Sequence, residues 1–195
     1  MALDVANQIK ERGTDLFKKG NYEQAAKKFV KALRCECLPA LYSSSRLSSP
    51  QHPLLDLDRH LHLDLPERDR DLEAQHTNLR LSLLLNSCLA SLKVGGAASA
   101  QTVIKHATRA LNLDGNPEKV PMTKQLTAAD KAKALYRRAM AHVILKDEPE
   151  AIKDLEAAQA LQPDDAAVKK ELAAAKKRVE ERKAKARAAY SRMFN

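Results

Sequence analysis

The chain has 195 residues, a formal net charge of +9 at pH 7, five glycines, no tryptophan and only 4% aromatic residues. Its abundance of Ala, Leu, Lys and Glu favours helices over sheets, and its length suffices for one well-buried domain. The positive charge predicts an acidic partner, without deciding between a peptide, a nucleic acid and a membrane surface.

The cysteines and the apolar segments indicate the compartment in which the protein works. Cys35, Cys37 and Cys88 are odd in number and form no paired C-x2-C motif, so we expect reduced thiols. No stretch approaches the ~20 apolar residues of a membrane span, and the segment that begins at Met1 lacks the apolar core of a signal peptide. We therefore expect a soluble, cytoplasmic protein, also compatible with the nucleus, that has no membrane partner.

Residues 1–39 are predicted to form a first pair of helices. Val5, Ile9 and Leu16 follow an approximately helical period, and Gly20 can end this first helix. A second amphipathic segment, YEQAAKKFVKALR, follows directly. The two segments together predict one helical hairpin.

Residues 40–80 break this pattern with Ser, Pro, Asp, Arg and His, and we expect an irregular, partly disordered insert. About ten residues at its end can join the following helix. Four histidines of the insert raise the question of a metal site, but no cysteine or well-spaced carboxylate completes a ligand set, so we predict no metal and no cofactor. These histidines are His52, His60, His62 and His76.

Two further helix pairs are predicted at 81–119 and 120–164. In the first of them, LSLLLNSCLASLK is followed by the turn VGGAASAQ, which we expect to be about three residues longer than the other turns, and by a helix over about 100–113. In the second, AKALYRRAMAHVILK is followed by EPEAIKDLEAAQAL, which has a proline in its first turn. Thr127 and Asp130 predict an N-terminal cap that starts the leading helix of this pair early.

Residues 165–195 are predicted to form one long capping helix. Val168, Leu172, Ala175 and Val179 lie on one helical stripe that can cover the last helix pair, as the terminal unit of a repeat array requires. The basic end ERKAKARAAYSRMF is expected to project beyond the body. It is interpreted either as a solvated face or as a segment that binds calmodulin or another acidic surface.

Small and bulky residues recur in the first and third helix pairs at one constant offset. The matched positions are Gly13 with Ala139, Ala25 with Ala151, Phe29 with Leu155, and Ala32 with Ala158. Small residues let two helices approach closely, and the bulky residue fills the space between them. With Pro163 at its end, this spacing is typical of the tetratricopeptide (TPR) repeat, a helix–turn–helix unit of ~34 residues. We therefore predict an all-α TPR solenoid of three repeats plus a C-terminal capping helix, an architecture suited to binding peptides.

The first helix of each repeat lines the concave side of such a solenoid, and its register identifies the side chains that face the groove. Lys10 and Thr14 are four residues apart in the first repeat, and so are Lys133 and Arg137 in the third, which places each pair on one helix face. Asn86 occupies the position of Arg137 in the second repeat. These five residues are predicted to converge on one groove.

The chemistry of this set favours a carboxylate ligand. Lys133 and Arg137 are like charges at a spacing that costs a few tenths of a kcal/mol, and a bound anion reverses the sign of that contribution. Hydrogen bonds between a charged donor and a carboxylate contribute ~1.5–3 kcal/mol each when desolvated. In a chain this basic, such cation pairs also arise by chance and face water. The register shared by three repeats favours the carboxylate site over that alternative.

Residues 8–36 and 81–195 resemble the carboxylate-clamp TPR domains of chaperone cofactors, and most closely the C-terminal domain of cyclophilin 40-type peptidyl-prolyl isomerases. The segments that resemble this family are IKERGTDLFKKGNYEQAAKKFVKAL, LLLNSCLASLK, KAKALYRRAMAH, EAIKDLEAAQALQPDDAAV and the ending KAKARAAYSRMF. The resemblance implies a co-chaperone-type module whose groove binds the acidic C-terminal tail of heat-shock protein 90 or 70.

The resemblance also implies which residues form the clamp. It assigns four positions to Lys10, Asn86, Lys133 and Arg137. At the fifth position the family has Asn and this chain has Thr14, whose single hydroxyl has less reach than an amide NH2. We therefore expect a weaker clamp at this position.

No enzyme is predicted in these residues. Cyclophilin-type isomerases have their active site on a β-barrel domain that precedes the repeats, whereas Met1 leads almost directly into the first repeat here. No Ser/His/Asp or Cys/His arrangement and no Gly-rich phosphate loop is visible, and few aromatic residues lie among the basic ones to stack on bases, so we expect no specific nucleic-acid binding. The chain is interpreted as a protein-interaction module, with the alternative that it is a fragment of a TPR-containing cyclophilin isomerase without its catalytic domain.

Overall fold

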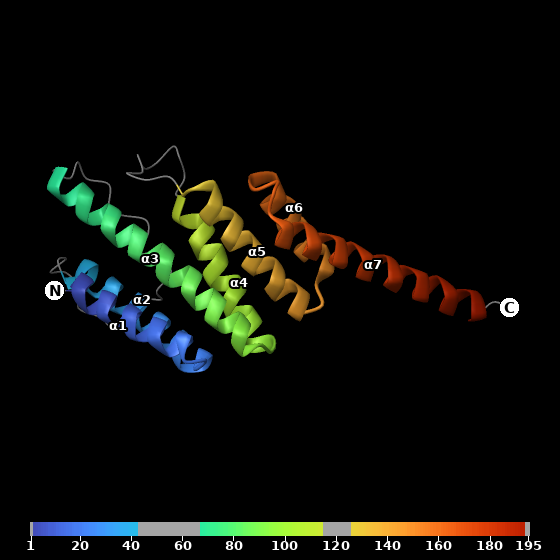
Figure 1. The fold of residues 1–195 in the computed structure, drawn as a ribbon, viewed down its shortest axis with the longest axis horizontal. Coiled ribbons are helices and arrows are strands. Elements are labelled where there is room, and N and C mark those ends of the chain that lie inside the picture. Colours follow the sequence, from blue (N-terminus) through green and yellow to red (C-terminus); the bar gives the residue numbers. More distant parts are fainter. Residues whose placement is uncertain (1, 43–66, 115–125, 194–195) are drawn as a thin grey trace.

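The structure, a computed structural model, describes residues 2–42, 67–114 and 126–193, and these residues form seven α-helices and no strand. In chain order the helices are α1 (Ala2–Lys18), α2 (Tyr22–Tyr42), α3 (Glu67–Val94), α4 (Ala97–Leu111), α5 (Ala128–Ile144), α6 (Glu148–Leu161) and α7 (Ala166–Met193). A short 3-10 turn, Asn112–Asp114, follows α4. The predicted all-α architecture is therefore confirmed (Figure 1).

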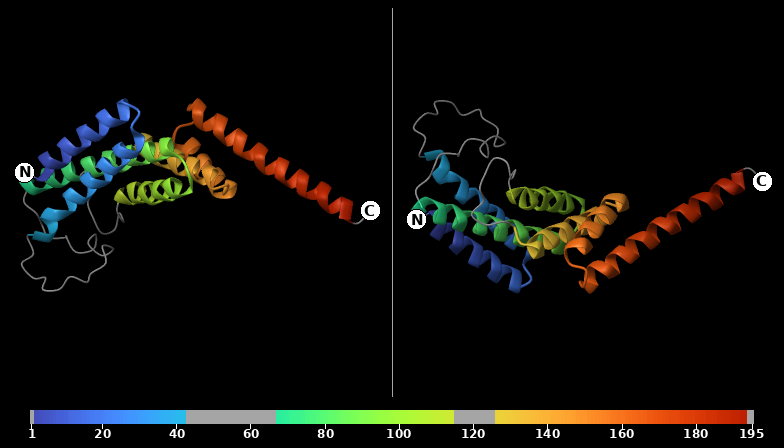
Figure 2. Two further views of the ribbon diagram at one scale, coloured as in Figure 1. Left: turned by 90° about the horizontal axis from the view of Figure 1, so that it is seen from below. Right: turned by 90° about the horizontal axis from the view of Figure 1, so that it is seen from above.

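The helices pack in sequence order, as in a repeat array. α1 packs on α2, α3 on α4, and α5 on α6, and each pair also packs on the next through α2 with α3 and α4 with α5. α7 packs on α6 at the end of the stack. Figure 2 shows α2 and α4 on the same side of α3, with α1 on its other side. Because each unit contacts its neighbours, the stack extends in one direction.

The repeated small and bulky positions lie in the core, as predicted. Gly13, Ala25, Phe29 and Ala32 are buried, and so are their counterparts in the third repeat. Gly13 marks the closest approach of α1 and α2, since a Cβ atom there would lie 2.8 Å from Cε1 of Phe29. A side chain at this position would therefore push the buried ring or the helices apart.

The turn between α3 and α4 differs from the prediction. It consists of Gly95 and Gly96 alone, and both have positive φ angles of 75° and 81°. Glycine adopts this left-handed conformation without steric cost, so two residues suffice to reverse the chain. The residues that follow, which were expected to lengthen the turn, form the first turn of α4 instead.

The insert predicted at 40–80 is shorter than expected at both ends. Residues 40–42 complete α2 and residues 67–80 belong to α3, so more than about ten residues at the end of the insert are helical. The remainder, with three of the four histidines, lies outside the described residues. In the part of the chain that the structure describes, no group of three or more His, Cys, Asp or Glu side chains is placed to hold a metal ion.

The long α7 begins at a side-chain cap and ends in solvent. The backbone N–H of Ala167 donates to Oδ1 of Asp165 at 2.8 Å. Of the predicted stripe, Val168, Leu172 and Ala175 are buried against the last repeat, whereas Val179 is half-buried. Residues 180–192 are exposed throughout, and Figure 2 shows this end projecting from the stack. The capping role is confirmed, and the binding of calmodulin or another acidic surface stays a prediction.

None of the helices that the structure describes is long and apolar enough to span a bilayer. Of the three cysteines, the structure describes the side chain of Cys88, which is a buried free thiol. Burial raises the pKa of this thiol to about 12, so it stays protonated and unreactive at neutral pH.

Candidate functional site

The helix that contains two of the predicted site residues begins at a side-chain N-cap. The backbone N–H of Asp130 donates to Oγ1 of Thr127 at 3.1 Å, and this hydroxyl donates in turn to Oδ2 of Asp130 at 2.7 Å. The predicted cap is confirmed, and α5 begins directly after it. Lys133 and Arg137 therefore lie on successive turns of α5, one above the other on the same face.

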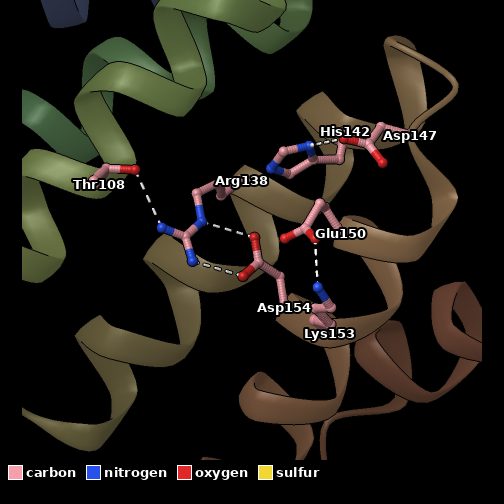
Figure 3. A network of polar contacts seen from close by, with 7 residues as sticks. All are labelled: Thr108, Arg138, His142, Asp147, Glu150, Lys153 and Asp154. Atoms are coloured by element: carbon pink, nitrogen blue, oxygen red, sulfur yellow. Dashed lines mark hydrogen bonds and ion pairs between the residues drawn. The ribbon is translucent and has the colours of Figure 1, made fainter.

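Two adjacent arginines of α5 point to different neighbours. Nε and Nη2 of Arg138 donate to the two carboxylate oxygens of Asp154 on α6, both at 2.7 Å, and Nη1 donates to Oγ1 of Thr108 on α4 at 3.1 Å. Figure 3 shows this three-helix contact. Asp154 is only 9% exposed in its side chain, so the bidentate pair is largely desolvated and fixes α5 between α4 and α6.

Arg137 faces the other way, toward α3. Its Nη1 donates to the backbone carbonyl of Leu85 at 2.6 Å. Burial lowers the pKa of Arg137, but an arginine in a protein remains charged. No carboxylate pairs with it among the described residues, and the nearby thiol of Cys88 stays neutral because burial raises its pKa to about 12. The guanidinium is thus a partly desolvated cation with unused N–H donors.

Asn86 lies next to this arginine contact in the sequence of α3. It is half-buried and follows Leu85, whose carbonyl accepts the hydrogen bond from Arg137. The next residue of α3, Ser87, is held against α4 by a hydrogen bond of 2.9 Å between its Oγ and Nδ1 of His106. The structure therefore brings the segments of Asn86 and Arg137 together.

The two predicted residues of α1 are one turn apart. Lys10 and Thr14 are half-buried, and Oγ1 of Thr14 donates to the backbone carbonyl of Lys10 at 3.0 Å. The only proton of this hydroxyl is therefore engaged within its own helix. α1 packs on α3 as α5 does, but the convergence of Lys10 and Thr14 with Arg137 on one point stays a prediction.

Lys133 has a partner that the sequence analysis did not consider. Its Nζ lies 3.3 Å from Oδ1 of Asp130, one turn earlier on α5. The spacing of three residues between an acid and a base was the available signal for this pair. Since the side chain of Lys133 is 55% exposed, the pair is weak, of the order of 0–1 kcal/mol.

Comparison with known proteins places this fold in a class. No protein-family model matches the chain. Among solved structures, the C-terminal TPR-containing domain of an FK506-binding protein from Plasmodium falciparum has a TM-score of 0.63 and 20% identity, with 93% of each chain covered. At this identity the likeness shows the fold alone. The chain is a TPR-repeat domain, as its repeated small and bulky residues predicted.

Sequence relatives give the closer relationship. The chain is 37% identical to peptidyl-prolyl cis-trans isomerase D of Mycosarcoma maydis over 192 residues. The aligned region is 96% of this chain and 42% of that protein. The corresponding proteins of Cryptococcus neoformans and Kluyveromyces lactis are 36% and 34% identical over 99% of this chain. The resemblance to cyclophilin 40-type isomerases is thereby confirmed, and the chain spans less than half the length of these relatives.

Proposed function

We propose that this chain is a co-chaperone-type interaction module that binds the acidic C-terminal tail of heat-shock protein 90 or 70 through a carboxylate clamp. The observation that supports it most is the state of Arg137, a partly desolvated guanidinium that, among the described residues, donates to the carbonyl of Leu85 and pairs with no carboxylate. A carboxylate that reaches such a cation displaces little further water from the guanidinium and forms charge-assisted hydrogen bonds with it.

The clamp has a defined order of strength in this proposal. Arg137 is the strongest contact because its charge is already partly desolvated, and Asn86 adds an amide donor beside it. Lys10 adds a second cation, with no ion pair of its own among the described residues. Lys133 must leave Asp130 to reach the ligand, but an exposed pair of this kind costs only about 0–1 kcal/mol to break.

Thr14 is the weakest member of the clamp. Its hydroxyl must give up the carbonyl of Lys10 before it can donate to a ligand, which cancels most of the gain from the new hydrogen bond. The variant Thr14→Asn supplies an amide NH2 in its place and is expected to bind the peptide more tightly. Weaker binding by this variant would contradict the register assigned to the first repeat.

Isothermal titration with the peptide Met-Glu-Glu-Val-Asp, the heat-shock protein 90 tail that the family resemblance implies as ligand, tests the proposal directly. The free acid is expected to bind at least about tenfold more tightly than the C-terminal amide, because the clamp recognises the terminal carboxylate. Arg137→Ala is expected to weaken binding by about 1.5–3 kcal/mol. Arg109→Ala removes the same charge from an exposed position on α4 and serves as the matched control. Equal affinities for acid and amide would refute the clamp.

The alternative is that the chain is part of a longer peptidyl-prolyl isomerase. It is supported by the names of the relatives and by the 42–43% of their length that the chain covers. We assign no catalytic role to the described residues. An assay of prolyl isomerisation with this chain is expected to match a heat-inactivated control, and a rate above that control would require an active site within the chain.

A further inference from the structure

A hollow of about 780 Å³ lies between α2 and α4, over the C-terminal end of α3. α2 and α4 lie on the opposite side of α3 from α1 (Figure 2), and none of the five clamp residues lines this hollow. Its volume lies within the range of small-ligand sites. We call it the α2–α4 groove.

The floor of the α2–α4 groove is apolar and made of small side chains. Ala26 and Val30 of α2 face Val94 of α3 and Ala98 of α4 across it. Val94 is 42% exposed although it is aliphatic, so part of this floor is open to water. Small residues on both walls leave room for the backbone of another helix to approach closely.

The rim of the groove is basic. Lys27, Lys31 and Arg34 form one stripe along α2, each about one turn from the next. Lys27 pairs with Glu23 at 2.7 Å, and both side chains are largely exposed. Among the residues that the structure describes, Lys31 and Arg34 form no ion pair, so these two exposed cations lie beside an apolar floor without a described acidic partner.

The start of α4 adds to this positive field. Its N-cap residue, Gly96, provides no side-chain cap, so no N-cap side chain accepts from the N–H groups of the first turn. Ala98 and Ser99 of that turn line the groove. The positive end of the helix dipole therefore lies at the same groove as Lys31 and Arg34.

We propose that the α2–α4 groove is a second peptide-binding surface, which binds an acidic amphipathic helix. Leucine-type side chains of that helix cover the floor around Val94 and Ala98, and its carboxylates pair with Lys31 and Arg34. This mode needs no free C-terminus, unlike a carboxylate clamp, so the two surfaces differ in the chemistry that they recognise. A protein that binds at both can contact two partners, or two segments of one partner, at the same time.

A blocked synthetic helix tests the groove without involving the clamp. The probe is an acetylated and amidated peptide of about 18 residues, longer than the ~12–15 that an isolated helix needs, with Leu along one face and Glu on its flanks. A second probe has Lys in place of Glu. Fluorescence anisotropy is expected to show saturable binding of the acidic probe and at least about tenfold weaker binding of the basic one.

Matched variants locate the binding. Lys31→Glu is expected to weaken binding of the acidic probe about tenfold, whereas Lys28→Glu makes the same charge change on α2 at a position that does not line the groove and leaves it within about twofold. Ala98→Trp fills the groove from an exposed position and is expected to abolish binding, while circular dichroism stays unchanged. Arg137→Ala, which disables the clamp, leaves binding of this probe unaffected.

Several results would overturn the proposal. These are an absence of saturable binding, equal effects of Lys31→Glu and Lys28→Glu, or loss of binding in Arg137→Ala. A second copy of the chain is the other candidate occupant. If sedimentation shows a dimer that Ala98→Trp dissociates, while the acidic probe does not compete, the groove is a self-association surface and the peptide proposal is wrong. Since the clamp is not used, failure here leaves the proposed function untouched.

Discussion

Replacing His106 by Asn tests how strongly the α3–α4 contact depends on a neutral imidazole. Burial lowers the pKa of His106 from 6.5 to about 4, and the nearby charges of Arg109 and Lys105 lower it further in the same direction. The unfolded chain takes up a proton near pH 6.5, while the folded chain does so only near pH 4. The folded state is therefore favoured above pH 6.5 and loses this contribution as the pH falls toward 4.

The size of the effect follows from the difference between the two pKa values. The free energy of unfolding should fall by about 2 kcal/mol at pH 5 and by about 3 kcal/mol at pH 4 through this residue alone. His106→Asn keeps an amide group near Ser87 but cannot titrate. Subtracting the stability of the variant from that of the wild type at each pH removes the contributions of the carboxylates.

Urea unfolding at pH 7, 6, 5 and 4, followed by circular dichroism, measures this difference. We expect the advantage of the wild type over His106→Asn to shrink steadily as the pH falls. Titration of the His106 ring by NMR gives the folded-state pKa independently. If the two stability curves run parallel from pH 7 to pH 4, the imidazole is not buried against Ser87, and the packing of α3 on α4 described here is wrong.

Two further substitutions probe the packing that holds the repeats together. Gly13→Ala should destabilise the chain by about 1–3 kcal/mol because its Cβ would lie 2.8 Å from the ring of Phe29. In a double-mutant cycle, Phe29→Leu should cost less stability in the Gly13→Ala background than in the wild type. Additive costs would contradict the close contact. Arg138→Met should lower the free energy of unfolding by about 2–3 kcal/mol because it leaves the carboxylate of Asp154 buried without a partner. Adding Asp154→Asn should recover part of this loss, as measured by thermal unfolding. If nothing is recovered, the loss comes from packing and not from the unpaired charge.

Much of the fold could be predicted from the order of residues. Gly13 and Phe29 recur in the third repeat as Ala139 and Leu155, and a recurring combination of small and bulky residues has few explanations other than closely packed helix pairs. The cap at Thr127 is equally local, since it depends on residues three apart. Such features are readable because helix geometry fixes which neighbours in sequence become neighbours in space.

The turn between α3 and α4 could not be predicted from its own residues alone. The segment after Val94 contains two glycines followed by small residues that suit either a long turn or the start of a helix. The prediction chose the long turn. The helix formed instead, because α4 packs Ala100 and Val103 into the core, and tertiary burial outweighs the weak local preferences of such residues.

For the candidate site too, some features could be predicted from the sequence and others appeared only in the structure. Register alone placed Lys10, Asn86 and Arg137 on the first helices of three repeats, because that register follows from the repeat period. It could not show that Arg137 reaches the carbonyl of Leu85, or that the neighbouring Arg138 is paired with Asp154. Two adjacent arginines look alike in sequence, and only the packing of α5 between α3, α4 and α6 decides that Arg138 pairs with a carboxylate while Arg137 donates to a backbone carbonyl.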